Sequence, residues 1–257
     1  MNPSEPSAPA DGFFGSGAAA LSPPPPPVIG LAHGSRHPDG SAALRSLMAE
    51  VARTGGLVAE AAFLDLAEPD LTTVALRLAE AGHRRAVVVP LLFTVAFHAT
   101  VDVPEALSAA SAASGVELLV GDILGTGPEV ADLVRTSMAA SAVAEDTSVL
   151  LYAVGSSSAS ANEAVHDLAT RLSASRPGSV RAAFGTVDPR VAAVLPDLPP
   201  PVAVVPLFLS PGLLLKPVAE LAARHGWTMA PPLGDLAAPV VLSRWAAVTA
   251  AAAAARG

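Results

Sequence analysis

The sequence contains no cysteine among its 257 residues. This absence excludes disulfides, thiolate metal sites, cysteine nucleophiles and cysteine-ligated iron–sulfur clusters. Lysine is nearly absent as well, because Lys216 is the only lysine among 15 basic residues, and the formal net charge is −8. A chain this acidic, without a basic run, is a poor candidate for binding nucleic acid.

Charged residues are scarce, at 15% of the chain, whereas hydrophobic residues make up 51%. This balance allows a sizeable core and favours a soluble α/β protein. Residues 1–27 lack the positive region of a secretory signal and end in five prolines, so we expect a disordered, proline-rich arm. The alanine-rich stretch after Trp245 is expected to be a last helix that ends in a short tail, 252–257. We expect a cytoplasmic protein without a membrane segment.

Apolar runs alternate with amphipathic stretches along the rest of the chain. Alternation of this kind predicts parallel strands that are covered by helices. We expect strands at Val28–Ala32, Leu57–Leu64, Ala86–Leu92 and near Val116–Val120, and helices near Ala42–Arg53, over Pro69–Ala81, from about Asp102–Pro104 and from about Pro128.

The same order of motifs then repeats in the second half of the chain. Segment 148–165 echoes 27–44, and segment 202–218 echoes 86–102. We therefore predict an α/β protein with two homologous lobes, each a doubly wound parallel sheet, that face a crevice. The N-terminal lobe is expected over 28–147, and a degenerate C-terminal lobe over 148–251.

The two halves differ in their histidines. His33 and His98 of the first half align with Val154 and Leu214 of the second. His33 ends the first strand and His98 lies just beyond the third, so both are expected at the edge where open α/β sheets bind ligands. Either histidine alone is most simply structural, but a pair that the repeat lacks indicates a shared functional site. His37, in the turn after His33, is a candidate to assist this pair, but solvent exposure is the simpler expectation for it. The remaining histidines are most simply solvated or helix-capping side chains: His83, His166 and His225.

Polar residues near these histidines complete the candidate site. Asp65 follows the second strand directly and is expected to face the crevice. Gly34 allows close backbone approach, Ser35 with nearby amides suits an anion, and Arg36 offers a bidentate clamp for a carboxylate. Thr94 is a further candidate for a hydrogen bond to a ligand.

Two imidazoles and a carboxylate form a ligand set that suits Fe(II), Co(II), Ni(II) or Zn(II), and they accept protons near neutral pH. The H-E-x-x-H spacing of many zinc hydrolases is absent, as is the nucleophile elbow of serine hydrolases. The residues leave three classes open: a metal-handling enzyme, a metal carrier, and a hydrolase that uses a histidine-bound metal.

The motifs LAHGSRHPDG, FLDLAEP and VPLLFTVAFHATVDVPEAL, in this order, resemble the sirohydrochlorin chelatases of the class II, CbiX/SirB type. These enzymes insert cobalt or iron in cobalamin and sirohaem synthesis. The resemblance runs from Val28 to about residue 250. It implies a lyase that inserts Fe²⁺ or Co²⁺ into sirohydrochlorin with release of two protons, and that needs no organic cofactor. The alternative is a non-enzymatic carrier of the metal or of the metallated tetrapyrrole.

Within this resemblance, His33, His98 and Asp65 hold the metal and accept the protons. Asp65 stands where family members commonly have glutamate, so its carboxylate reaches one methylene less far. Arg36 and the helix-start amides near Ser35 would offset the repulsion between an acidic protein and a substrate with many carboxylates. Because both lobes belong to one chain, we expect a monomer. The choice between iron and cobalt stays open, because these ligands tolerate both.

Overall fold

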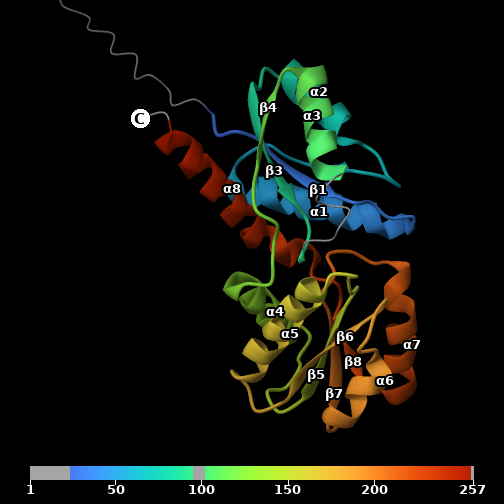
Figure 1. Cartoon of the computed structure of the whole chain (residues 1–257). Coiled ribbons are helices and arrows are strands. Elements are labelled where there is room, and N and C mark those ends of the chain that lie inside the picture. The colour runs from blue at the N-terminus through green and yellow to red at the C-terminus, as the bar shows by residue number, and fades with distance from the viewer. Residues whose placement is uncertain (1–23, 95–101, 256–257) are drawn as a thin grey trace, which may run out of the picture.

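The computed structural model describes residues 24–94 and 102–255. Two four-stranded parallel sheets form two lobes, one above the other in Figure 1, with strand orders β2-β1-β3-β4 and β6-β5-β7-β8. The strands are β1 (Val28–Ala32), β2 (Ala59–Phe63), β3 (Arg85–Pro90), β4 (Glu117–Val120), β5 (Ser148–Ala153), β6 (Val180–Phe184), β7 (Val202–Pro206) and β8 (Thr228–Met229).

Helices cover both faces of each sheet, which confirms the two doubly wound α/β lobes. In the first lobe α2 and α3 pack on one face and α1 and α8 on the other; in the second lobe α6 and α7 oppose α4 and α5. The helices are α1 (Pro38–Gly55), α2 (Leu71–Glu80), α3 (Asp102–Ser114), α4 (Pro128–Ala140), α5 (Ala159–Ser173), α6 (Val191–Val194), α7 (Lys216–His225) and α8 (Ala238–Ala254).

The alternation of side chains along β1 shows how the sequence builds this layering. Ile29 and Leu31 pack toward α2 and α3, whereas Val28 packs toward α1. A Cβ at Gly30 would lie 2.4 Å from Sδ of Met48, so glycine allows α1 to approach the sheet closely. The core beneath α1 and α8 continues into the core beneath α4 and α5, so the two lobes share one apolar interior.

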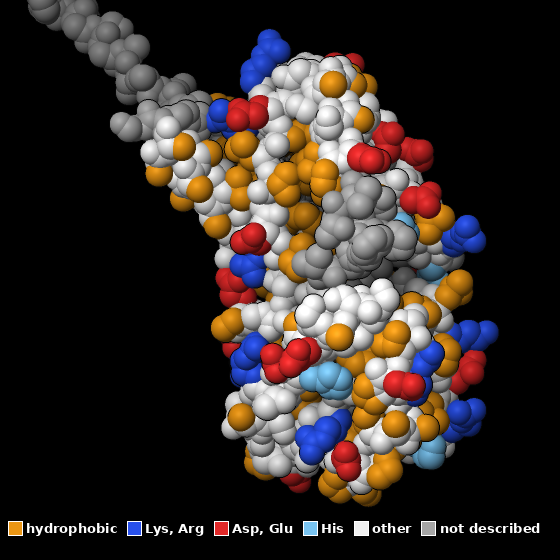
Figure 2. Space-filling model, viewed as in Figure 1, with side chains coloured by type: hydrophobic (Ala, Val, Ile, Leu, Met, Phe, Trp, Pro, Cys, Tyr) orange, Lys and Arg blue, Asp and Glu red, His pale blue; other side chains and the backbone are white. Residues whose placement is uncertain are grey.

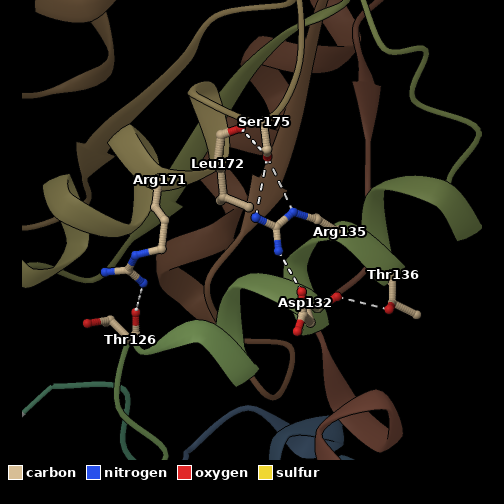
Figure 3. Close-up of polar contacts among 7 residues, drawn as sticks. All are labelled: Thr126, Asp132, Arg135, Thr136, Arg171, Leu172 and Ser175. Carbon is tan, nitrogen blue, oxygen red and sulfur yellow. Dashed lines mark hydrogen bonds and ion pairs between the residues drawn. The ribbon is translucent and has the colours of Figure 1, made fainter.

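The lobes exchange their last helices. α4 follows β4 in sequence but packs against α5 and β7 of the other lobe, and α8 returns to pack against α1 and β3. In Figure 3, Arg135 of α4 donates hydrogen bonds to Oγ of Ser175 at 3.3 and 3.4 Å, and Arg171 of α5 donates to the carbonyl of Thr126 at 2.7 Å. A boundary at residue 147 therefore separates the two sheets but not their helices.

Helix α8 is held along the N-terminal lobe. With the 3₁₀ turn before it, Gly234–Ala254 is long and apolar enough to cross a membrane, by length and composition only, and 22% of its 18-residue apolar stretch is buried inside the protein. Nε1 of Trp245 donates to the carbonyl of Pro26 at 2.9 Å, which ties the end of the predicted arm to α8. The helix continues to Ala254, beyond the predicted start of the tail at residue 252. Small hydrophobic side chains gather on its outer side in Figure 2.

Candidate active site in the crevice between the lobes

A pocket of about 620 Å³ lies between the lobes, at the carboxyl ends of β1, β3, β5 and β7. This is the edge where open parallel sheets bind ligands. The N-terminal lobe contributes most of the polar lining, from His33, Gly34, Ser35, Arg36, His37 and Thr94. The C-terminal lobe contributes a mostly apolar wall that includes Val154, Leu207, Phe208, Leu213 and Leu214.

His33 lines this pocket because of the turn that follows β1. The amide of Asp65 donates to the carbonyl of His33 at 2.9 Å, which clamps this turn onto the loop after β2. Gly34 has a φ of 100°, and a Cβ there would lie 1.9 Å from the carbonyl oxygen of Asp65. Glycine is therefore required at this contact. The His33 side chain is exposed, so its imidazole is accessible to a ligand in the crevice.

The loop from Ser35 to His37 begins helix α1. Oγ of Ser35 accepts a hydrogen bond from the amide of His37 at 3.0 Å, and Nδ1 of His37 accepts one from the amide of Asp39 at 3.3 Å. His37 is thus the N-cap of α1 and is partly buried, whereas the sequence favours a solvent-exposed side chain. Arg36 is exposed, lines the pocket, and forms no ion pair within residues 24–94 and 102–255.

Asp65 lies beside His33 in the backbone, but its carboxylate is not part of the pocket lining. Its Oδ1 accepts a hydrogen bond from the amide of Leu66 at 2.7 Å, and the side chain is exposed. The other predicted metal ligand, His98, lies outside the described residues. Within the described part of the chain, no three His, Asp or Glu side chains gather into a metal-binding group. The set of His33, His98 and Asp65 therefore stays a prediction.

Thr94 reaches the pocket from the segment after β3 and is half-buried there. The amide of Leu91 donates to the carbonyl of Leu31 at 2.8 Å, and the carbonyl of Leu92 accepts from the amide of Gly125 at 3.2 Å. These bonds hold the residues that lead to Thr94 against β1 and against the segment after β4.

The C-terminal lobe repeats this backbone with different side chains. The amide of Thr186 donates to the carbonyl of Val154 at 2.9 Å, as the amide of Asp65 does to His33. Gly155 has a φ of 89° and matches Gly34. Thr186 therefore stands where the first lobe has Asp65, and its Oγ1 donates a second hydrogen bond to Val154 at 2.8 Å. The sequence repeat shows the loss of imidazoles, but the loss of the carboxylate becomes visible only from the paired loops.

The apolar wall of the C-terminal lobe is supported by Tyr152, the only tyrosine of the chain. Its hydroxyl donates to the carbonyl of Leu214 at 3.0 Å, and its ring stacks on that of Phe208, with the ring centroids 6.0 Å apart. Burial raises the pKa of Tyr152, so the hydroxyl keeps the proton that it donates. This residue was not among the predicted site residues, although its place at the end of β5 mirrors that of Leu31 in β1.

Comparisons with known proteins agree with this architecture. The chain matches the model of the CbiX family over residues 27–141 and again over 148–243, once for each sheet. Its fold is similar to that of SirB from Bacillus subtilis with Fe³⁺, at 24% sequence identity and a TM-score of 0.69, covering 86% of this chain and 94% of that chain. A comparison with curated protein sequences gave no match.

Two further solved structures share this fold. The sirohydrochlorin chelatase SirB from Bacillus subtilis subspecies spizizenii, in complex with cobalt, is 23% identical, with a TM-score of 0.70 over 87% of this chain and 95% of that chain. CbiX, described as the terminal enzyme for biosynthesis of siroheme in denitrifying bacteria, is 21% identical, with a TM-score of 0.59 over 85% of this chain and 98% of that chain.

Proposed function

The chain belongs to the CbiX family, and from this premise we propose that it is a sirohydrochlorin chelatase, a lyase that inserts Fe²⁺ or Co²⁺ into a tetrapyrrole. The observation that carries the proposal is the two-sided crevice, in which the exposed imidazole of His33 faces a pocket with a mostly apolar opposite wall. Neutral imidazole suits both metals, and an apolar wall suits the face of a conjugated macrocycle. The Fe³⁺ and cobalt bound to the two SirB structures support a metal as the substrate.

The reaction exchanges two protons for one metal ion. A divalent metal forms bonds to the four ring nitrogens, and the two pyrrole N–H bonds break with release of two H⁺. His33, with His98 as its predicted partner, presents the metal and accepts the protons, because neutral imidazole is both a ligand and a base near neutral pH. Asp65 is the proposed third group. Its Oδ1 accepts a hydrogen bond from the amide of Leu66, so Oδ2 is the oxygen proposed to reach the metal or to accept a proton.

Substrate charge is the main obstacle to binding, since the protein has a net charge of −8 and sirohydrochlorin carries many carboxylates. At physiological salt, charges farther apart than about 8 Å are largely screened. Local groups therefore decide the binding, and Arg36, exposed on the pocket lining without an ion-pair partner among the described residues, supplies a cation for a carboxylate. Ser35 and Thr94 are the proposed neutral hydrogen-bonding groups.

An anaerobic assay tests this function. Purified protein is mixed with sirohydrochlorin and either Fe²⁺ or Co²⁺, and the visible spectrum is followed against a protein-free control. We expect acceleration over many turnovers with at least one metal, and the faster metal indicates a sirohaem or a cobalamin pathway. A spectral change that stops at one equivalent would instead identify a carrier. Absence of any change with both metals would refute the chelatase.

A further inference from the structure

The C-terminal rim of the pocket, formed by Val154, Leu213 and Leu214, exposes large apolar side chains to water. Leu213 is 70% exposed and Leu214 is 38% exposed, and both line the pocket. Val154, at the position that His33 occupies in the other lobe, is 41% exposed on the same wall. Large aliphatic side chains gathered in a pocket and left in contact with water gain free energy when a ligand covers them.

These leucines belong to a fixed turn. The 3₁₀ turn Leu213–Leu215 is closed by a hydrogen bond from the amide of Leu215 to the carbonyl of Gly212 at 3.1 Å. Leu215 is 7% exposed and anchors the turn in the lobe. The buried hydroxyl of Tyr152 holds the carbonyl of Leu214 from below. The exposed leucines are therefore presented in a set position before any ligand arrives.

The only lysine of the chain follows this turn directly. Lys216 begins α7, is exposed, and forms no ion pair with any carboxylate of the described residues, including Glu220 one turn further along the helix. A cation in the first turn opposes the helix dipole, so helix stability does not account for it. Two residues span at most about 7 Å, so the long, flexible side chain of Lys216 starts within reach of the pocket lining at Leu214.

We infer that this rim recognises the substrate: Leu213 and Leu214 cover part of the macrocycle face, and Lys216 binds a peripheral carboxylate. Arg36 on the opposite wall would then bind a second carboxylate, so that cations of both lobes flank an apolar centre. This arrangement fits a flat apolar ring with acidic groups on its edge. The inference rests on the proposed function and assigns the C-terminal lobe a part in substrate binding.

Charge variants at the two ends of α7 test the role of Lys216. Lys216→Gln is expected to raise the KM for sirohydrochlorin about threefold or more, and Lys216→Glu further, with kcat little changed. Lys216→Arg should restore most of the affinity. Arg224→Gln removes an equal charge from the last turn of α7, roughly 12 Å away along the axis, and should leave KM unchanged. A KM that responds equally to Lys216→Gln and Arg224→Gln would overturn the specific contact.

A matched pair of leucine variants tests the apolar half of the rim. Leu213→Ser is expected to raise KM about tenfold, because a ligand-covered leucine is lost. Leu236→Ser replaces a leucine that is 39% exposed in the 3₁₀ turn before α8, away from the pocket lining, and should change KM little. Circular dichroism confirms that each variant folds. An unchanged KM in Leu213→Ser would overturn the apolar contact.

Chemical modification gives an independent readout, because Lys216 carries the only lysine amine. We expect saturating metal-free sirohydrochlorin to slow the acetylation of Lys216, measured by mass spectrometry, while the N-terminal amine reacts at its usual rate. Equal acetylation with and without sirohydrochlorin would overturn the inference. If the unmodified wild-type protein shows no turnover with either metal, the proposed function itself fails. Normal turnover with an unprotected Lys216 leaves that function standing.

Discussion

In the N-terminal lobe, the loops after β1 and β2 bring His33 beside Asp65; in the C-terminal lobe the same two loops bring Val154 beside Thr186. The bond that joins the loops runs between backbone atoms and is 2.9 Å long in both lobes. Neither the imidazole nor the carboxylate is needed to close the loops. Their presence in one lobe alone therefore points to chemistry rather than to folding.

The loops that lead into α1 and α5 also differ between the two lobes. Oγ of Ser35 accepts from the amide of His37 at 3.0 Å, and Oγ of Ser156 accepts from the amide of Ser158 at 3.1 Å. In the second lobe Asn162 also binds both backbone groups of Ser156, each at 2.8 Å. Each loop is thus tied to the helix that follows it, but only the N-terminal loop also presents an imidazole and a guanidinium, from His33 and Arg36, to the pocket. One lobe provides reactive side chains, and the other provides a shaped wall.

The largest difference in metal-insertion rate is expected between two single variants, one that removes the imidazole of His33 and one that trims the matching side chain, Val154. His33→Ala is expected to lower the metal-insertion rate by about 100-fold or more, because a ligand and base is lost. Val154→Ala should stay within about threefold of wild type, since it trims only apolar surface. His98→Ala is predicted to behave as His33→Ala does. Steady-state rates with sirohydrochlorin measure this, and equal losses in both lobes would contradict the division of roles.

A smaller effect is expected at the carboxylate. Asp65→Ala should lower the insertion rate about tenfold or more, whereas Asp65→Glu, which keeps the carboxylate and extends it by one methylene, should match or exceed wild type. Thr186→Val removes one hydrogen bond to Val154 and should cost stability of about 1 kcal/mol with little change in rate. Steady-state insertion rates detect the expected loss of activity at Asp65, and urea unfolding detects the expected loss of stability at Thr186. Full activity in Asp65→Ala would remove Asp65 from the site.

The exchanged helices α4 and α8 contact each other through a carboxylate, and we expect this contact to weaken in acid. A hydrogen bond from Ser243 of α8, with a smaller contribution from Arg244, lowers the pKa of Glu129 at the start of α4. A lowered pKa stabilises the fold above the unfolded-state value of about 4.3, and that stability is lost as the pH falls through the folded-state pKa.

We therefore expect Glu129→Gln to lower the free energy of unfolding at pH 7 by less than about 1 kcal/mol, because Glu129 is half-exposed, and to lower the melting temperature slightly. The difference from wild type should shrink as the pH falls below about 4. Glu163→Gln on α5, an exposed carboxylate, is the control and should show no such pH dependence. A difference in melting temperature between Glu129→Gln and wild type that stays constant across pH would contradict this contact.

The smallest effect is expected inside α4. Oγ of Ser137 is buried and has no hydrogen-bond partner within the described part of the chain, so Ser137→Ala should be neutral or stabilise the protein by up to about 1 kcal/mol. Ser46→Ala has the opposite expectation, because Oγ of Ser46 donates to Asp235 at 2.9 Å. Urea unfolding of both variants shows whether each substitution raises or lowers the free energy of unfolding. A clear loss of stability in Ser137→Ala would show that its hydroxyl has a partner.

The sequence predicts the elements and the repeat well, because apolar strands and paired motifs are local signals. The strand at Val28–Ala32 is confirmed at both ends, and the predicted helix near Ala42–Arg53 lies within α1. The exchange of α4 and α8 was not predicted, since an amphipathic helix carries no mark of which sheet it will cover. The predicted boundary at residue 147 divides the sequence between the two sheets, but α4 and α8 each pack on the lobe across that boundary.

The site was predictable only in part. His33 and Arg36 follow a strand directly, so their place at the pocket could be inferred from sequence order. Asp65 and Thr186 are 121 positions apart, the same offset that relates His33 to Val154, but aspartate and threonine share no chemistry that would draw attention to the match. The support that Tyr152 gives to Leu214 joins residues 62 positions apart, a contact that no local pattern encodes.

Cobalt binding tests the central claim most directly, that only the N-terminal lobe holds the metal. Anaerobic titration of the tag-free protein with Co²⁺, followed by visible absorption and equilibrium dialysis, should give one bound ion per chain. His33→Ala should abolish that binding, and Val154→Ala should leave it intact. Two equivalent ions per wild-type chain, or one ion retained by His33→Ala, would contradict the account.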